Sequence, residues 1–335
     1  MLPLHHQAVA CLASEQKPHC WDGTAVGSIL ATRDLPIPIG YIFLTSAGQS
    51  AADCFGVVPR LDRIGEKGAF VSDTDELFSV RDKVVLVSGG SRGIGRALAQ
   101  GFVQRGAFVF IAGREEATLQ AAAAEISTGT HPADFVVCDV SKPETIQPMV
   151  DAVVAKAGRI DSLLNVAGVN IRKRVETYTV EEYDYITNIN LKGAFLVAQA
   201  VGRQMIAQGT GGTIINIDSL NTFAPLKGVL PYAMSKAGLG MMTRGMAMEW
   251  GDHGIRVNAI APGFVLTDLT NKLWSDPTMQ AWGKANTPLR RLGRPDDMVG
   301  AAIFMASDAS RYMTGQVIYV DGGITCGMQW PIPLN

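Results

Sequence analysis

Charge of either sign is scarce in this chain. Charged residues make up 18% of its 335 positions, and 29 Lys and Arg nearly balance 31 Asp and Glu, which leaves a net charge of −2. A chain so close to neutral lacks the field that attracts nucleic acid or an anionic membrane surface. Long apolar runs are missing as well, since none approaches the ~20 residues that cross a bilayer. Neither nucleic acid nor a membrane is therefore expected as a partner.

Cysteine is also sparse. The five cysteines are widely spaced, at positions 11, 20, 54, 138 and 326. An odd number at such spacing does not suit a disulfide framework and is typical of free thiols in a reducing compartment. We therefore expect a cytoplasmic protein.

Apolar side chains and glycine, by contrast, are abundant. Hydrophobic residues reach 47%, and there are 36 glycines. This is the composition of a well-buried globular protein with many tight turns. The length allows one large α/β domain or two smaller ones.

The first 75 residues differ from the remainder. Neither helical nor strand periodicity persists there, although residues 37–44 predict a short strand that Pro38 would confine to a sheet edge. We expect an irregular, poorly ordered extension, or a start codon assigned too far upstream, ahead of a single domain over residues 76–335. Three alternatives stay open: a processed export signal around residues 7–11, an added interaction arm, and a metal site. The metal site would use His5, His6, Cys11, His19 and Cys20.

From residue 77 onward, short apolar strands alternate with helical segments. Seven such strands imply a Rossmann-type, doubly wound α/β fold, in which helices cover both faces of a parallel sheet. A sheet of this kind binds ligands at the carboxyl ends of its strands, near the point where the strand order reverses. The expected strands are Lys83–Ser88, Phe108–Ala112, Phe135–Cys138, Ser162–Asn165, Thr213–Ile217, Ile255–Ile260 and Val317–Val320, with the first two helices over residues 96–105 and 115–126.

A glycine-rich turn, Gly89-x-x-x-Gly93-x-Gly95, follows the first of these strands and opens the first helix. Glycine permits the tight turn and lets a pyrophosphate approach the backbone, while the start of the helix offers unpaired N–H groups. Placed directly after the domain's first strand, this turn predicts a dinucleotide-binding site.

The end of the second strand indicates which dinucleotide binds. An acidic residue there would bind the ribose hydroxyls of NAD, whereas an arginine would accommodate the extra phosphate of NADP. The chain has Ala112-Gly113-Arg114, with no carboxylate before Glu115, and it has a second arginine, Arg92, inside the glycine turn. Two guanidinium groups at one site suit a phosphate dianion. We expect NADP(H), with NAD(H) bound at lower affinity; the alternative is that both arginines are solvated surface residues.

A possible proton-transfer pair stands near the middle of the chain. Tyr232 lies thirteen positions after Ser219, and Lys236 follows four residues later. Residues four apart share one face of a helix, so the Lys236 ammonium can lie beside the Tyr232 phenol. A free tyrosine has a pKa near ~10, and a neighbouring positive charge lowers it. The pair therefore predicts an acid/base group, with Ser219 as a polar anchor.

Over residues 77–325 the chain resembles the short-chain dehydrogenase/reductase family, in its shorter-subunit branch and nearest to members of the gluconate and deoxygluconate dehydrogenase type. Eight motifs in register carry the resemblance: Ser88-Gly-Gly-Ser-Arg-Gly-Ile-Gly95, Cys138-Asp139-Val140, Asn165-Val-Ala-Gly168, Asn188-Ile-Asn190-Leu191, Ser219, Tyr232-x-x-x-Lys236, Pro262-Gly263 with Thr267, and Asp321-Gly-Gly323.

The resemblance implies a role for each matching position. Tyr232 would be the general acid/base, Lys236 would lower its pKa and hold the nicotinamide ribose, Ser219 would hydrogen-bond the reacting oxygen, and Asn190 would hold a water of the proton relay. Asp139 would face the adenine. The implied cofactor-binding set is Gly89, Ser91, Arg92, Gly93, Ile94, Gly95, Arg114, Asp139, Val140, Asn165, Ala167, Gly168, Tyr232, Lys236, Pro262, Gly263, Val265 and Thr267.

The chemistry of the residues agrees with these roles. Hydride transfer to a carbonyl creates an alkoxide, so a proton donor and a second hydrogen-bond donor must converge on one oxygen. Nothing in this reaction requires a metal. Three positions depart from the family pattern: Ser88 replaces a threonine, Val166 replaces a second asparagine, and Asp218 stands before Ser219, where a small residue is common.

Arg172-Lys173-Arg174 follows the fourth strand, close to where the family's substrate enters. Three adjacent cations suggest an anionic substrate that would contact Arg172, Ser219 and Tyr232; a solvated basic loop is the alternative. We expect an oxidoreductase of a sugar acid or polyol. The rival readings are a reductase of 3-oxoacyl thioesters on a carrier protein and a catalytically idle NADP-binding regulator.

Two later segments complete the expectations. Residues 264–294 should form a mobile lid over the substrate, with Trp274 and Trp282 packing its short helices. Residues 232–250 form a helix so apolar that it must be buried, either in the core or against another subunit. The family resemblance implies the second, as a homodimer or homotetramer.

Overall fold

The computed structural model describes residues 76–129 and 131–327. The chain divides into two units, Met1–Ala69 and Phe70–Asn335, and every described residue belongs to the second. The expected strand at residues 37–44, the export signal, the interaction arm and the histidine- and cysteine-containing metal site all lie outside the described residues. The domain boundary near residue 75 therefore stays a prediction.

The described residues form a seven-stranded sheet in the order β3-β2-β1-β4-β5-β6-β7. All neighbouring strands are parallel. This confirms the predicted doubly wound Rossmann-type sheet, and the order reverses between β1 and β4. The strands are β1 Val84–Ser88, β2 Phe108–Gly113, β3 Asp134–Val137, β4 Ser162–Asn165, β5 Gly212–Ile217, β6 Ile255–Pro262 and β7 Val317–Val320.

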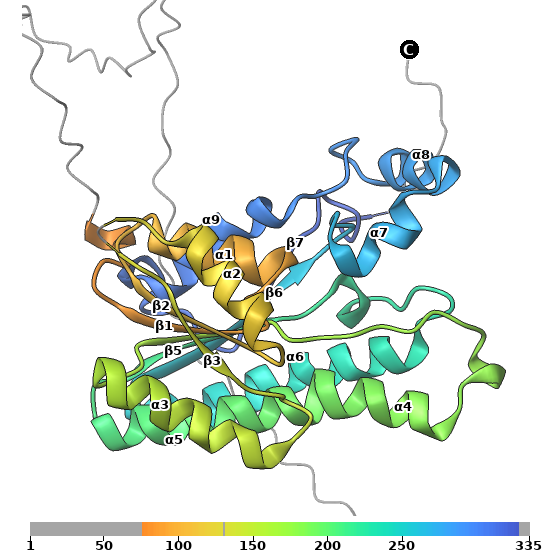
Figure 1. The fold of residues 1–335 in the computed structure, drawn as a ribbon. Coiled ribbons are helices and arrows are strands. Elements are labelled where there is room, and N and C mark those ends of the chain that lie inside the picture. The colour runs from red at the N-terminus through yellow and green to blue at the C-terminus, as the bar shows by residue number, and fades with distance from the viewer. Residues whose placement is uncertain (1–75, 130, 328–335) are drawn as a thin grey trace, which may run out of the picture. The chain divides into compact units, whose positions relative to one another are not determined.

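Helices cover both faces of the sheet (Figure 1). One layer contains α1 Gly93–Val103, α2 Glu116–Ile126 and α9 Val299–Ala306, and the other contains α3 Ile146–Ala157, α4 Val180–Thr187, α5 Ala194–Gln208 and α6 Leu230–Trp250. Two further helices, α7 Asp268–Trp274 and α8 Pro277–Asn286, lie beyond the carboxyl end of β6. Among the described residues, no helix is both long and apolar enough to cross a bilayer.

The central strand shows why its sequence is apolar at every position before its last residue, Ser88. All five residues of β1 are buried. Val85 and Val87 belong to the hydrophobic cluster under α1, α2 and α9, whereas Val84 and Leu86 belong to the cluster under α3, α5 and α6. Successive side chains of a strand point to opposite faces, so a strand with a core on both sides has no polar face.

Buried amides fix the carboxyl ends of β4 and β5. Asn165 Nδ2 donates to the Ala194 carbonyl at 2.9 Å and to Asn216 Oδ1 at 3.2 Å. Asn216 Nδ2 in turn donates to Thr243 Oγ1 at 2.9 Å. This chain of hydrogen bonds joins the two strands to α5 and α6. It holds the strand ends that carry the candidate site in one register.

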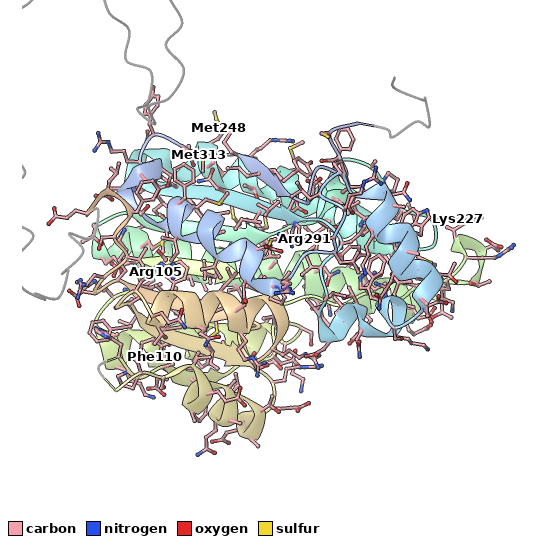
Figure 2. The ribbon with its side chains drawn as sticks, turned by 90° about the horizontal axis from the view of Figure 1, so that it is seen from above. Arg105, Phe110, Lys227, Met248, Arg291 and Met313 are labelled. Atoms are coloured by element: carbon pink, nitrogen blue, oxygen red, sulfur yellow. The ribbon has the colours of Figure 1, made fainter. Side chains whose placement is uncertain are left out.

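The apolar helix α6 is only partly buried. Met234, Met241 and Met248 are 48%, 62% and 85% exposed, and Met248 lies at the molecular surface in Figure 2. Of the two alternatives for this helix, complete burial in the core is thus wrong for its methionine-bearing side, because the sheet can cover only one face of a helix. This side keeps the role of a subunit contact as a prediction.

Candidate active site

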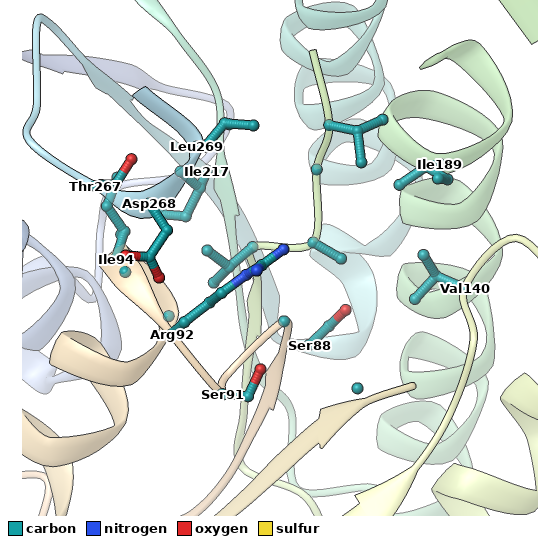
Figure 3. Close-up of a pocket in the computed structure, with 18 of the residues that line it drawn as sticks. Ser88, Ser91, Arg92, Ile94, Val140, Ile189, Ile217, Thr267, Asp268 and Leu269 are labelled. Atoms are coloured by element: carbon teal, nitrogen blue, oxygen red, sulfur yellow. The ribbon is translucent and has the colours of Figure 1, made fainter. Parts of the chain in front are cut away.

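A cavity of about 330 Å³ opens at the carboxyl ends of the strands, on both sides of the point where the strand order reverses. Every predicted cofactor-binding residue except Asn165 lines it, and Ser219 lines it as well. Arg172 and Asn190 are not among its lining residues. Figure 3 shows the glycine turn on one side of this cavity, with Val140 and Ile189 on the other.

The glycine turn leaves no room for side chains at two positions. A Cβ on Gly95 would lie 2.1 Å from the Gly89 carbonyl oxygen, and a Cβ on Gly89, whose φ is +76°, would lie 2.8 Å from the Ala167 nitrogen. The turn is therefore folded directly against the end of β4 and the start of α1. No side chain caps the start of α1, so its first N–H groups stay available to an anion such as a pyrophosphate.

Two arginines stand beside the glycine turn and the end of β2, where the adenosine part of a cofactor is expected. The Arg92 side chain extends across it from the glycine turn (Figure 3), and Arg114 follows the end of β2. Both are exposed, and in the described part of the chain no ion pair is recorded for either. Glu115, the first carboxylate after β2, accepts a hydrogen bond from Thr118 Oγ1 at 3.1 Å through Oε2. The charge at this corner therefore favours an anion.

Asp139 lies at the end of β3, where the adenine is expected. Its Oδ1 accepts hydrogen bonds from the Ser141 backbone N–H at 3.0 Å and from Ser141 Oγ at 2.7 Å. Ser141 therefore holds the carboxylate in place through one oxygen. The cavity also reaches Cys138, a buried free cysteine, and burial raises the pKa of its thiol.

Two asparagines predicted for the site, Asn165 and Asn190, are not among the residues that line the cavity. Asn165 directs its amide into the buried network between β4 and β5 and does not line the cavity. Its place in the cofactor-binding set stays a prediction. Asn190 lies in a π-helical turn, Asn188–Gly193, between α4 and α5. Its side chain accepts from the Val169 N–H and donates to the Val169 carbonyl, both at 2.8 Å.

The Asn190 side chain therefore fixes the loop after β4 through both ends of its amide. The π-helical turn that carries it is a feature found often at functional sites. The relay water itself stays a prediction.

Tyr232 and Lys236 lie on one face of α6, as their spacing predicts. Lys236 Nζ is 5.7 Å from the centre of the Tyr232 ring and donates to the Ile217 carbonyl at 2.6 Å. Burial lowers the pKa of Lys236 to about 8, against the opposing charge of Asp218. Lys236 therefore remains mostly protonated at neutral pH.

The pKa of Tyr232 differs from the expectation. Burial raises it above the usual value for tyrosine, while hydrogen bonding with Ser219 and the charge of Arg172 act in the opposite direction. Removing the phenol from water penalises its ionised form. Without a bound cofactor and substrate, Tyr232 is accordingly a proton donor, which is the form that carbonyl reduction needs.

Asp218 is the main residue of the site to which sequence reasoning gave no role. It is 2% exposed, lines the cavity, and its Oδ1 accepts from Thr222 Oγ1 at 2.6 Å, while its Oδ2 is buried with no hydrogen-bond partner. Burial raises the pKa of Asp218 to about 6, while the charge of Lys236 lowers it. The sequence feature that could have pointed to Asp218 is that it stands before Ser219, where the family commonly has a small residue.

Other lining residues missed from the sequence follow predicted ones directly, namely Asp268, Leu269 and Thr270 after Thr267, or come from distant elements, such as Ile189. Thr267 begins α7 and lies against Gly93 of the glycine turn, since a Cβ on Gly93 would be 3.6 Å from Thr267 Cβ. The expected lid segment thus starts at the cofactor turn.

The two ends of the lid segment meet. The Gly293 N–H donates to the Phe264 carbonyl at 2.7 Å, and the Leu266 N–H donates to the Gly293 carbonyl at 3.0 Å. Trp274 is buried, with its ring centre 5.2 Å from that of Phe264, so its packing role is confirmed. Trp282 is 44% exposed, 5.5 Å from Phe264. Whether the segment moves as a lid stays a prediction.

On the substrate side, two loops are joined around Arg172. The Lys173 N–H donates to the Gly228 carbonyl at 3.0 Å, and Tyr178 Oη donates to the carbonyls of Ile171 and Gly228. The backbone is thus held on both sides of Arg172. Lys173 pairs with Glu182 at 2.8 Å. Arg174 lies 3.6 Å from Glu176.

Known proteins resemble this chain over most of the described residues. Residues 89–325 match a protein family described as enoyl-(acyl carrier protein) reductase. Gluconate 5-dehydrogenase of Gluconobacter oxydans (strain 621H) is 37% identical over 253 residues, which is 76% of this chain and 98% of that protein. The 3-oxoacyl-acyl-carrier-protein reductase of Chlamydia trachomatis serovar D is 39% identical over 244 residues, 72% of this chain and 97% of that protein.

A solved structure has the same arrangement. Gluconate 5-dehydrogenase from Burkholderia cenocepacia J2315, in complex with NADP and tartrate, matches with a TM-score of 0.73 at 36% identity, covering 76% of this chain and 99% of that one.

Replacing Asp218 with Asn should move the deprotonation of Lys236 to lower pH. Asp218 raises the pKa of Lys236 against the effect of burial, so its loss should bring that pKa below about 8. Lys236 is charged below its pKa and neutral above it. If Lys236 holds the cofactor's ribose, NADPH affinity should fall as pH rises through about 8 in the wild type and at lower pH in Asp218→Asn, which fluorescence titration can measure.

Two variants identify the group that titrates. Lys236→Met should remove the pH-dependent step, whereas Tyr232→Phe should keep it. The same midpoint in the wild type and in Asp218→Asn would show that Asp218 does not control the charge of Lys236.

Proposed function

Because the chain belongs to the short-chain dehydrogenase/reductase family, we propose that it is an NADP-dependent oxidoreductase that interconverts a secondary alcohol and a ketone on a sugar acid or related polyol. The observation that carries this proposal is the meeting of Ser219, Tyr232 and Lys236 at the wall of the cavity that the glycine turn also lines. Relatives in this family are named dehydrogenases and reductases. Membership of the family therefore supports an oxidoreductase reaction.

The residues divide the proton chemistry between them. A bound nicotinamide supplies or accepts the hydride. Tyr232 donates its phenolic proton to the substrate carbonyl oxygen as negative charge develops there, and takes that proton back in the oxidative direction. Ser219 donates a hydrogen bond to the same oxygen and so stabilises the developing charge. The Lys236 ammonium stabilises the phenolate that remains.

The preference for NADP rests on the charges beside β2. Arg92 and Arg114 are exposed cavity residues without a recorded carboxylate partner in the described ranges. Glu115, which would have to bind the ribose of NAD, is already hydrogen-bonded to Thr118. An arginine pair binds a phosphate dianion through several N–H donors. NAD lacks the 2′-phosphate and so cannot make these contacts.

An anionic substrate is favoured by Arg172. Lys173 and Arg174 lie next to glutamates, whereas no ion pair is recorded for Arg172 in the described part of the chain. The charge of Arg172 acts to lower the pKa of the Tyr232 phenol, which supports a place for this guanidinium near the reacting groups. The Burkholderia relative was crystallised with tartrate, a dicarboxylate, and this supports the same class here.

The two rivals are less well supported. A reductase of carrier-bound 3-oxoacyl thioesters needs a basic surface for its acidic partner. Of the three cations here, Lys173 is paired with Glu182 at 2.8 Å and Arg174 lies 3.6 Å from Glu176. The Chlamydia relative, which is named a 3-oxoacyl-acyl-carrier-protein reductase, is the observation that favours this alternative. A pure NADP-binding regulator would need neither Tyr232 nor the hydroxyl of Ser219.

Assembly and location complete the proposal. The exposed methionines of α6 form an apolar surface that suits a symmetric contact in a homodimer or homotetramer. Cys138 and Cys326 are both free thiols, in keeping with a cytoplasmic location.

Removing Arg114 should weaken NADP(H) much more than NAD(H). The 2′-phosphate loses a charge-assisted contact, so we expect the KM for NADPH to rise roughly 10- to 100-fold, with the KM for NADH little changed. Steady-state kinetics with both cofactors measure the difference. Arg96→Ala is the matched control, because Arg96 lies on α1 outside the cavity and pairs with Glu125. An equal rise for both cofactors would contradict the assigned role.

Removing Arg172 should affect acidic substrates selectively. A screen of sugar acids, polyols and keto compounds at the nicotinamide absorbance band should find turnover of a sugar acid such as gluconate by the wild type. In Arg172→Ala, its KM should rise about tenfold or more, because the carboxylate loses a charge-assisted hydrogen bond.

Neutral polyols should be turned over equally by the wild type and by Arg172→Ala. Arg174→Ala, which removes an exposed cation of the same loop, should match the wild type throughout. Equal effects of Arg172→Ala on acidic and neutral compounds would overturn the anion assignment.

A further inference from the structure

The hydroxyl of Ser219 is held by a neighbour that the family's catalytic residues do not include. Ser219 Oγ accepts a hydrogen bond from the Asn221 backbone N–H at 3.1 Å and a second from Asn221 Nδ2 at 3.0 Å. A serine hydroxyl has one proton to donate and two lone pairs with which to accept. Asn221 therefore fills both acceptor positions and leaves only the proton of Ser219 free.

The remaining proton has one direction available. Ser219 and Tyr232 both line the cavity, and hydrogen bonding between them lowers the pKa of the phenol. A hydroxyl that accepts twice from the loop side must donate toward the cavity. This is the side on which the oxygen of a bound carbonyl would lie.

The orientation of the Asn221 amide is itself fixed. Its Oδ1 accepts from the Leu226 N–H at 2.9 Å, so its NH₂ group must face Ser219. The opposite flip would place two N–H groups against each other. Asn221 is 8% exposed, and in a water-poor environment its donors have no alternative partner.

We propose that Asn221 is a positioning residue that commits the Ser219 hydroxyl to donating a hydrogen bond to the reacting oxygen. The proposal rests on the proposed function and deepens it. A hydroxyl free to rotate would spend part of its time as an acceptor and would stabilise the developing alkoxide less well. The gain comes from preorganisation, because the donor needs no reorientation when the charge appears.

Asn221→Asp tests this with little change of shape. A carboxylate cannot donate to Ser219 Oγ and instead accepts its proton, which turns the hydroxyl away from the substrate. We expect kcat to fall roughly 10- to 100-fold, somewhat less than for loss of an oxyanion-stabilising donor, with the KM for NADPH unchanged. In a Ser219→Ala background, the same substitution should cost no more than about twofold, since there is no hydroxyl left to orient.

Two further variants separate positioning from general damage. Asn221→Ala removes the side-chain donor without adding charge. When it is combined with Ser219→Ala, it should cause no further loss of kcat. Asn258→Asp is the matched control: Asn258 is a buried amide on β6 that donates to the Met313 carbonyl and accepts from the Gln316 N–H. Asn258→Asp carries the same kind of buried substitution and should leave kcat within about threefold.

A readout without turnover keeps the proposal testable if no substrate is found. With ¹³Cζ-labelled tyrosine, the NMR resonance of Tyr232, assigned by its loss in Tyr232→Phe, should move in the same direction in Asn221→Ala and Ser219→Ala. The double variant should show no further change.

The outcomes distinguish the two levels of inference. NADPH binding without turnover of any carbonyl by the wild type would defeat the proposed function, and the resonance of Tyr232 would still decide the role of Asn221. Additive losses in the double variants, or an unchanged Tyr232 resonance in Asn221→Ala, would overturn the positioning role while leaving the oxidoreductase intact.

Discussion

The buried ammonium of Lys236 is the constraint to which the rest of the site is fitted. Lys236 is only 4% exposed, and taking a charge out of water is costly unless it is hydrogen-bonded and balanced. The Ile217 carbonyl at the end of β5 accepts a hydrogen bond from Lys236 Nζ at 2.6 Å. The negative charge of Asp218 opposes the loss of a proton from Lys236. The fold makes this possible because the carboxyl end of β5 lies within hydrogen-bond reach of a side chain on α6.

The five residues after β5 show how closely fold and chemistry are joined. Asp218 balances Lys236, Ser219 faces the cavity, Asn221 fills the acceptors of Ser219, and Thr222 holds the Asp218 carboxylate through a 2.6 Å hydrogen bond. Thr222 thus aligns Asp218, Asn221 aligns Ser219, and the Leu226 N–H a little further along the chain aligns Asn221. The position of this turn is set by β5, which precedes it and pairs in parallel with β4 and β6.

Much of this was predictable from the sequence. Buried parallel strands are mostly apolar, so β1 and β5 could be recognised from short runs of Val, Ile and Leu. The glycine turn directly after β1 predicts a dinucleotide-binding site. The spacing of Tyr232 and Lys236 placed them on one helical face. These features are local, because they depend on periods of two or nearly four residues.

What the sequence could not supply depends on three-dimensional detail. Asn165 and Asn190 belong to the family's motifs, but only the folded chain shows that both amides turn away from the cavity toward backbone and side-chain partners. Arg172 could not be distinguished from Lys173 until Glu182, nine positions further on, was seen to neutralise the lysine. The raised pKa of Tyr232 reflects burial, which a helical spacing does not measure.

A single variant, Tyr232→Phe, examines whether proton transfer by Tyr232 underlies activity. Removal of one oxygen should leave NADPH affinity within about threefold, because the phenol is a minor part of the contact surface, while turnover of the best carbonyl substrate falls by ~10²–10⁴, the range for loss of a general acid. Binding retained with activity lost by that factor is the predicted result. Turnover close to that of the wild type would contradict the assignment of Tyr232 as the proton donor and would require another acid in the cavity.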